Sequence, residues 1–226
     1  MNGLSRLTGL LVLVSPVFAG EVQGHAIITK RLAKRTVSPV VYNLRGVTPQ
    51  AGSTAETESS SEFDRLAIML EGGNQPPKAP ETAVIDQHNI RFDPDLLIVP
   101  VGSTVQFPNS DPIFHNIFSL SKTQPFDLGF YPQHQSRTVK FPHPGIVQVY
   151  CHIHANMYAA IVVTSSPWYA RPSADGSFSW SGVPAGHYKL VAWHKVAGFF
   201  RTAVDVPESG KVEAAIRIPI DVEPEH

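Results

Sequence analysis

The chain has 226 residues, with 18 Lys and Arg against 19 Asp and Glu, so its formal net charge of −1 gives no reason to expect a nucleic-acid partner. A hydrophobic fraction of 42% excludes a wholly disordered chain, and 20 prolines argue against a helical bundle. The single cysteine excludes an intrachain disulfide and an all-cysteine zinc site, which leaves ten histidines beside one thiol as the feature that points to chemistry.

The first 19 residues have the organisation of a secretory signal peptide. Arg6 provides a positive charge, residues 10–14 (LLVLV) form an apolar stretch, and residues 17–19 (VFA) end at a small-residue cleavage site. The apolar stretch is too short to cross a bilayer, so we expect no integral membrane span after signal cleavage. The sequence therefore predicts an exported protein, periplasmic or secreted, whose mature chain begins near Gly20 and whose lone thiol is bound, buried or used.

The first part of the mature chain predicts strands with a polar loop and a stiff connector. Short alternating apolar runs bounded by turn residues are typical of β-structure. A Ser-, Thr- and Glu-rich stretch predicts a flexible loop, and a proline-rich stretch predicts an extended connector. In chain order these are strands at 21–29 and 37–44, the loop at 51–62, a strand at 65–71 and the connector at 75–80.

The central part of the chain has the length and strand spacing of a small β-sandwich. The expected strands lie at 83–86, 96–99, 103–107, 116–120, 136–141, 146–150 and 160–163.

The last part of the chain again predicts strands separated by turn residues. They lie at 178–180, 188–194, 202–206 and 212–218. Neither three strands before the central block nor four after it would close a sandwich alone. We therefore expect a discontinuous outer β-sandwich of residues 20–80 with 165–222, and an inserted domain of residues 82–164. The alternative is two consecutive domains.

The strongest chemical pattern lies at residues 150–157 (YCHIHANM). Alternation along the preceding strand places Cys151 at its end on the inward face, and His154 and Met157 follow at intervals of three residues. Such a tight loop can gather a thiolate, an imidazole and a thioether around one point. The best candidate for a fourth donor is His115, which lies where a proline-containing loop enters a strand.

Two imidazoles, one thiolate and one distant thioether are the ligand set of blue-copper sites. Zinc prefers four strong tetrahedral ligands and seldom recruits methionine, so copper is favoured over zinc. The expected ligands are His115, Cys151, His154 and Met157.

The stretch 99–163 resembles a cupredoxin, the small copper-binding sandwich of plastocyanin, pseudoazurin and amicyanin. The resemblance rests on VPVGSTVQFPNSD, HNIF, PGIVQVYCHIHANM and the closing IVV. It implies one mononuclear type 1 copper ion, with His115 as the upstream ligand and Cys151, His154 and Met157 as the downstream ligands. It also implies that the neighbourhood of Asn116 braces the cysteine sulfur.

The outer segments resemble a carboxypeptidase-regulatory or transthyretin-like sandwich, on GEVQGHAII, VVYNL and DGSFSWSGVPAGHYKLVAWH. With FPNSDPIFHNIFSLS and FDLGFYP, the whole arrangement resembles exported cupredoxins of the methylamine utilisation protein type. That resemblance implies no role in amine oxidation.

Other histidines offer alternative ligands. His152 follows Cys151, as in the His-Cys-His segments of multicopper oxidases, but the chain has no other His-x-His pair, so we expect His152 to be an exposed neighbour that could capture metal in a rearranged site. His134 and His143 are rival upstream ligands. His88, His187 and His194 are expected to be surface or structural residues.

The sequence as a whole predicts one-electron transfer between redox partner proteins, without turnover of a substrate. The alternatives are a copper carrier or sensor that does not cycle between redox states, and a metal-free structural β-module. Two features of the sequence would suit the binding of a partner, although each also has an ordinary structural explanation. They are the basic cluster at 30–35 and the aromatic residues Phe114, Phe130, Tyr131 and Tyr158.

Overall fold

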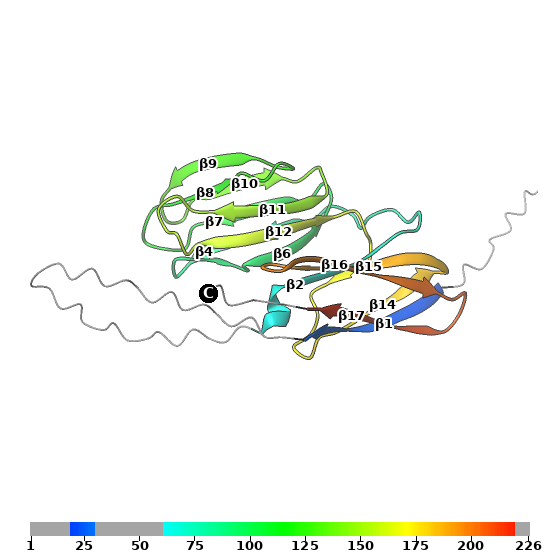
Figure 1. Ribbon diagram of the computed structural model, residues 1–226. Coiled ribbons are helices and arrows are strands. Elements are labelled where there is room, and N and C mark those ends of the chain that lie inside the picture. The colour runs from blue at the N-terminus through cyan, green and yellow to red at the C-terminus, as the bar shows by residue number, and fades with distance from the viewer. Residues whose placement is uncertain (1–18, 30–60, 220–226) are drawn as a thin grey trace, which may run out of the picture.

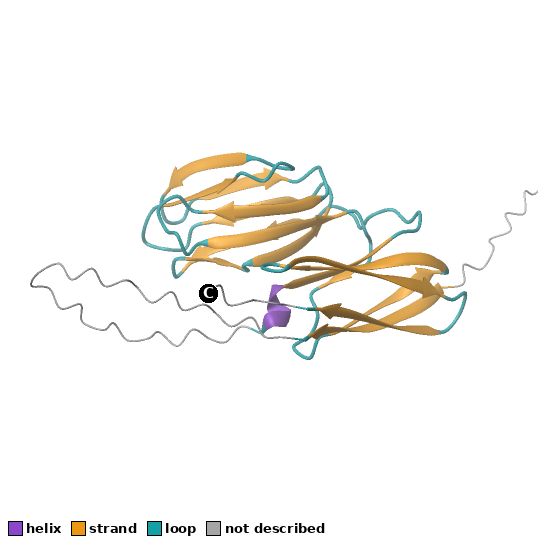
Figure 2. Ribbon diagram, in the orientation of Figure 1, coloured by secondary structure: helices purple, strands orange, loops and turns teal. Residues whose placement is uncertain are grey.

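The computed structural model of the chain describes residues 19–29 and 61–219. Strands dominate this part of the chain, and its one helix is the short 3-10 helix η1 (Glu62–Arg65), as Figure 2 shows. The prediction of an all-β protein is confirmed. The strands form two β-sandwiches that lie against each other, one above the other in Figure 1.

The outer sandwich combines strands from both ends of the described chain (Figure 1). Its two sheets have the orders β14-β1-β17 and β13-β2-β15-β16, so the two N-terminal strands lie inside sheets that are completed by C-terminal strands. The bounds are β1 (Ala19–Ile28), β2 (Leu66–Glu71), β13 (Tyr169–Ala170), β14 (Ser177–Pro184), β15 (Gly186–His194), β16 (Gly198–Val206) and β17 (Lys211–Ile218).

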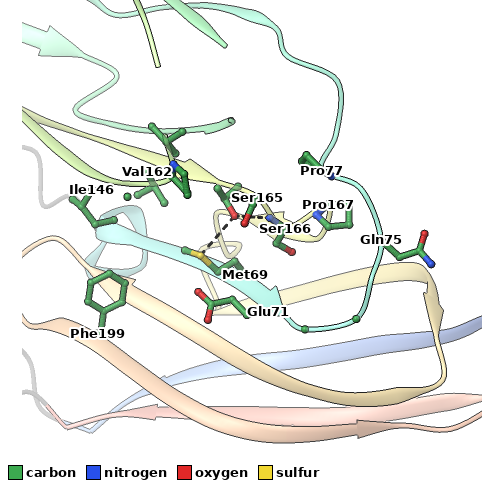
Figure 3. Close-up of a pocket in the computed structure, with 16 residues that line it drawn as sticks. Met69, Glu71, Gln75, Pro77, Ile146, Val162, Ser165, Ser166, Pro167 and Phe199 are labelled. Carbon is green, nitrogen blue, oxygen red and sulfur yellow. Dashed lines mark hydrogen bonds between the residues drawn. The ribbon is translucent and has the colours of Figure 1, made fainter. Parts of the chain in front are cut away.

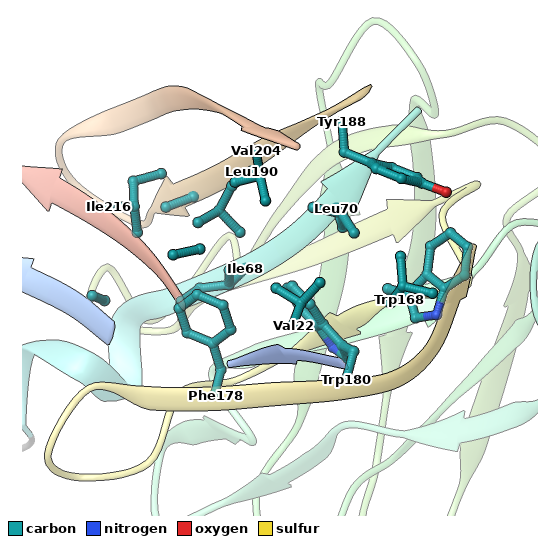
Figure 4. Close-up of a cluster of buried hydrophobic side chains, with 14 of the residues drawn as sticks. Val22, Ile68, Leu70, Trp168, Phe178, Trp180, Tyr188, Leu190, Val204 and Ile216 are labelled. Atoms are coloured by element: carbon teal, nitrogen blue, oxygen red, sulfur yellow. The ribbon is translucent and has the colours of Figure 1, made fainter. Parts of the chain in front are cut away.

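The core of the outer sandwich lies between these two sheets. Figure 4 shows side chains of one sheet, such as Val22 and Trp180, facing side chains of the other, such as Leu70 and Leu190. At Gly24 in β1 a Cβ atom would lie 2.4 Å from the Ala214 carbonyl oxygen, so the close approach of β1 to β17 depends on this glycine.

The central sandwich is built from consecutive strands of the middle of the chain. Its larger sheet has the order β6-β12-β11-β8-β9 and its smaller sheet β10-β7-β3, with a separate hairpin β4-β5. The bounds are β3 (Thr82–Val84), β4 (Asp86–His88), β5 (Arg91–Asp93), β6 (Leu96–Pro100), β7 (Thr104–Pro108), β8 (His115–Ser119), β9 (Phe126–Tyr131), β10 (Ser136–Lys140), β11 (Gly145–Tyr150) and β12 (Tyr158–Thr164).

A third apolar cluster joins the two sandwiches. Along β2, Leu66, Ile68 and Leu70 enter the outer core, whereas Ala67 and Met69 lie in the contact between the sandwiches. The same alternation holds in β15 and in β12, so these three strands are buried on both faces.

The predicted strands in the described residues all correspond to observed ones, within a few residues at their ends. The predicted strand at 37–44, most of the predicted loop at 51–62 and nearly all of the signal segment lie outside the described residues. The strands β4, β5, β9 and β13 were not predicted. Within the described residues, no helix has the length and apolar character that a membrane crossing requires.

Candidate metal centre

Three potential metal-binding side chains meet at one end of the central sandwich. His115 is the first residue of β8, Cys151 directly follows β11, and His154 lies in the loop between β11 and β12. The strands β8 and β11 are antiparallel and Tyr150, the last residue of β11, pairs with Phe118, so the start of β8 lies beside the residues that directly follow β11. Strand pairing thus joins residues that are 36 positions apart in the chain.

The donor atoms form a small triangle. The Nδ1 atoms of His115 and His154 are 3.0 Å apart, and Cys151 Sγ lies 4.0 Å from the first and 3.8 Å from the second. Donor atoms that surround one ion at about 2 Å are separated by about these distances. Two imidazole nitrogens and a thiolate sulfur suit copper, so the residues fit that ion.

The strand before Cys151 has the predicted two faces. Val147 and Val149 are buried in the same core cluster as Cys151, while Gln148 and Tyr150 on the other face are only partly buried. Cys151 itself is 6% exposed. The alternation of β11 therefore places the sulfur against the core.

Met157 closes the loop and lies in the core. Its backbone N–H donates to the carbonyl oxygen of His154 over 2.9 Å, and its side chain is 1% exposed within the cluster that contains Cys151. The loop therefore returns to the sandwich beside its own starting point.

His115 is held through its second ring nitrogen. Its Nε2 lies 2.8 Å from Oδ2 of the buried Asp111, while its Nδ1 faces Cys151 and His154. Burial by itself raises the pKa of Asp111, but hydrogen bonds from the Ile90 N–H, the His115 ring and the Asn89 N–H outweigh burial, so the pKa lies below its usual value. Asp111 is thus an anion at neutral pH.

His152 lies outside the donor triangle and is exposed, as the strand alternation predicts. Its ring stacks on Phe118 with centroids 3.9 Å apart, and its Nε2 is 3.4 Å from Asp127 Oδ2. The amide of Asn116 donates to Oδ1 of Asp127 over 2.7 Å. The side chain of Asn116 is thus hydrogen-bonded to Asp127. The expectation that the neighbourhood of Asn116 braces the sulfur of Cys151 stays a prediction.

Among the described residues, the other histidines lie outside the cluster of His115, Cys151 and His154. The rival ligands His134 and His143 are exposed, and so are His88 and His187. His194 is completely buried in the outer sandwich, where its Nε2 lies 3.3 Å from Glu62.

The aromatic residues named as a possible docking patch differ in their exposure. Phe114 and Phe130 are more than half exposed, Tyr158 is partly buried, and Tyr131 is fully buried. The hydroxyl of Tyr131 accepts from Gln87 Nε2 and donates to the Phe107 carbonyl oxygen, so Tyr131 belongs to the core.

Sequence reasoning gave no role to Asp111 or to the hairpin β4-β5. Asp111 lies four residues before His115 in the loop that was named, and a carboxylate close to a candidate ligand histidine is the signal that points to it. The hairpin has no Asn-Gly or Asp-Gly pair, which is the usual signal for such a turn.

A separate cavity of about 620 Å³ lies where the two sandwiches meet, away from the donor triangle. Figure 3 shows Met69, Ile146, Val162 and Phe199 among its lining, with the 75–77 segment along one side. Its wall is mainly apolar and contains neither cysteine nor histidine among the described residues.

No protein-family model and no curated protein matches the chain. Solved structures resemble part of it. They include a purple cupredoxin from Nitrosopumilus maritimus, with 24% identity over 36% of this chain and 99% of that chain and a TM-score of 0.34. A Cu(I) variant of amicyanin matches 43% of this chain and 98% of its own length, with 17% identity and a TM-score of 0.35.

A copper-containing nitrite reductase from Thermus scotoductus SA-01 matches 42% of this chain with 25% identity and a TM-score of 0.35. The alignment spans 24% of that enzyme's length. Because these TM-scores are low, the function proposed below rests on the geometry of this chain's own residues.

Proposed function

We propose that this chain is an exported protein that holds one type 1 copper ion and carries single electrons between redox partner proteins, without turning over a substrate. His115, Cys151 and His154 are the proposed strong ligands, and Met157 is the proposed weak one. The observation that carries the proposal is the convergence of two Nδ1 atoms and one sulfur within 4.8 Å of one another.

The choice of metal follows from the donor atoms. A thiolate and a thioether favour copper, and imidazole is a good ligand for both of its oxidation states, whereas zinc seldom recruits methionine. A bound copper ion supplies one-electron chemistry by alternating between Cu(I) and Cu(II). The chain contributes the placement of the donors and the exclusion of water from them.

Three of the four proposed ligands are buried. His115 is 0% exposed, Met157 1% and Cys151 6%, and His115 and Cys151 are held at the ends of paired strands. A framework of this kind resists movement of its ligands, so we expect little reorganisation when the charge of the site changes.

His154 is the most exposed of the four and is the proposed side of electron entry. The residues before the two histidines are apolar and exposed: Phe114 is 57% exposed and Ile153 is 51% exposed. Exposed apolar side chains beside a site are typical of a docking surface. We propose that a redox partner docks at this end of the central sandwich.

Export rests on the signal-like segment 1–19, from which we propose a periplasmic or secreted location. The outer sandwich is proposed to be a carboxypeptidase-regulatory-like domain into which the copper domain is inserted. Its contact with the central sandwich suits a scaffold or a partner-binding surface.

The proposal is tested by the absorption spectrum of the mature protein loaded with Cu(II). We expect one copper ion per chain, an intense visible band from charge transfer out of the thiolate, and reversible voltammetry. The variants His115→Ala and Cys151→Ser should lose the band, and His134→Ala is the matched control that should keep it.

The possible results separate the alternatives. A colourless protein that retains only Cu(I) would favour copper handling without redox cycling. A protein without stoichiometric copper, in which Cys151→Ser changes nothing, would favour a structural β-module. A band that survives His115→Ala would show that the upstream ligand was chosen wrongly.

A further inference from the structure

We propose that Asp111, gripped by the turn of the β4-β5 hairpin, is a positioning residue that keeps the Nδ1 lone pair of His115 directed at the metal centre. This inference rests on the proposed function for the identity of the metal. The state that it assigns to His115 belongs to the protein without metal and can be measured there.

The carboxylate of Asp111 has three nitrogen partners, and both of its oxygens are used. Oδ1 accepts from the backbone N–H of Asn89 over 2.7 Å, and Oδ2 accepts from the backbone N–H of Ile90 over 2.9 Å. Oδ2 also lies 2.8 Å from Nε2 of His115. Because Asp111 is 6% exposed, water has little access to replace any of these partners.

The contact with Asp111 determines which nitrogen of His115 carries the proton. Both oxygens of Asp111 accept a backbone N–H, so the carboxylate meets His115 as an acceptor and Nε2 of His115 is the donor. In the neutral imidazole, Nδ1 then keeps its lone pair. Histidines that bind metals commonly donate their other N–H to a carboxylate, which orients the ring and strengthens the nitrogen as a ligand.

A second consequence concerns His154. Its Nδ1 lies 3.0 Å from Nδ1 of His115, and two lone pairs do not attract each other at that distance. With His115 protonated at Nε2, the protein without metal should therefore hold its proton on Nδ1 of His154. The two imidazoles are expected in opposite tautomers.

The hairpin that supplies the two N–H donors has an unfavourable backbone. Asn89 and Ile90 both have positive φ angles, 54° and 56°, and this region is costly for a β-branched residue. Gln87, the completely buried residue of the adjoining strand, anchors the hairpin by donating to the Pro108 carbonyl and to Tyr131. A strained turn held in this way is typical of a functional position.

Asp127 offers a matched control at the same end of the sandwich. It also accepts two N–H donors, from Gly129 and Asn116, and it also faces a histidine. That histidine is the exposed His152, which is not a proposed ligand. Both donors reach Oδ1, so Asp127→Asn keeps an oxygen for Asn116 and Gly129 while it removes the charge at the half-exposed Asp127 without touching His115.

The first measurement is long-range proton–nitrogen NMR on the protein without metal. In the wild type and in Asp127→Asn, His115 should carry its proton on Nε2 and exchange it slowly, and His154 should carry its proton on Nδ1. Asp111→Asn should lose this pattern, since its amide can donate to Nε2 and its single oxygen cannot serve three donors. A wild-type protein with the proton on Nδ1 of His115 would overturn the inference, even if no variant folded.

The second measurement is copper affinity by competition with a chelator. Asp111→Asn should bind copper about 10–100-fold more weakly than the wild type, and Asp127→Asn should bind with wild-type affinity. Equal loss in both variants, or no loss in either, would contradict a positioning role. A wild type that binds no copper would end the proposed function, while the NMR result would still decide the state of His115.

Discussion

Two buried histidines illustrate how neighbouring groups decide what an imidazole does. His115 meets a carboxylate at one nitrogen and two other donor atoms at the other nitrogen. His194 accepts two backbone N–H groups, from Val196 and Ala197, at its Nδ1. In His115 the Nδ1 lone pair is left free to bind a metal ion, whereas in His194 the Nδ1 lone pair accepts the N–H groups that hold a turn.

The state of His194 predicts a dependence of stability on pH. Burial lowers the pKa of this histidine below 6.5, so the folded protein keeps it neutral while the unfolded chain protonates it. Its contribution to stability is present above about pH 6.5 and is lost as the pH falls. The slope of this loss should not exceed about 1.4 kcal/mol per pH unit, and the loss ends once the pH lies below the pKa of His194 in the folded protein.

Urea unfolding at pH 7.5 and pH 5.5 measures this effect. His194→Gln should lose less stability between these two pH values than the wild type. His88→Gln, at an exposed site, should behave as the wild type. An equally steep loss in His194→Gln would show that other groups cause the dependence.

The β4-β5 hairpin has a turn whose backbone conformation is unfavourable for one of its residues. The residues that face each other across it are Asp86 with Asp93, Gln87 with Phe92 and His88 with Arg91, which leaves two residues for the loop. Two-residue loops of this kind need positive φ at both positions, and Asn-Gly is the usual pair. Here the second position is Ile90.

Ile90→Gly should therefore stabilise the protein by about 0.5–1 kcal/mol. The substitution removes about 1–2 kcal/mol of backbone cost and adds about 0.5–1 kcal/mol of chain entropy. Val84→Gly is the matched control, because Val84 is equally exposed at 45% and lies in a strand. That variant should lose about 0.5–1 kcal/mol.

The denaturant midpoints of both variants give these values if the unfolding slope does not change. A loss of stability in Ile90→Gly as large as in Val84→Gly would mean that the turn is not strained.

The two sandwiches meet through an apolar contact supported by an ion pair between the buried side chain of Lys195 and the half-exposed side chain of Asp95. Trp193 and Val191 of β15 pack with Met69 of β2 in the cluster between them. Lys195 Nζ lies 2.6 Å from Asp95 and 4.5 Å from the Tyr158 ring centroid, so it also joins the outer sandwich to the central one. The outer sandwich contributes no residue to the donor triangle.

Trp193→Ala should lower the free energy of unfolding by about 3 kcal/mol or more, because it leaves a cavity in this contact. Phe199→Ala is the control: Phe199 is the cross-strand partner of Trp193 but is 46% exposed, so its removal should cost less than about 1 kcal/mol. Both variants should keep the wild-type copper spectrum.

Calorimetry and the absorption spectrum measure the two parts of this prediction. Equal effects of the two substitutions would show that the contact between the sandwiches contributes little. A changed spectrum in Trp193→Ala alone would show that the outer sandwich acts on the metal centre.

Local patterns in the sequence were enough for the all-β class and for most strands, because alternation and turn residues act over a few positions. The same holds for the three-residue spacing of Cys151, His154 and Met157. The continuous apolar runs in β2, β12 and β15 also carry information, since such runs are typical of strands buried on both faces. These runs do not show which sheet covers each face of the strand. The division of the chain into separately folding domains stays a prediction.

The sequence by itself determined the types of donor atom and placed three candidates close together in one loop. Only the tertiary structure brought the Nδ1 atom of His115 to 3.0 Å from that of His154, because the two residues are 39 positions apart and the pairing of β8 with β11 brings their surroundings together. It alone connected Asp111 to a turn some twenty residues earlier, through backbone N–H groups that every residue type possesses. Contacts made by the backbone leave no trace in residue identity, which is why Asp111 and its hairpin were found in the fold and not in the sequence.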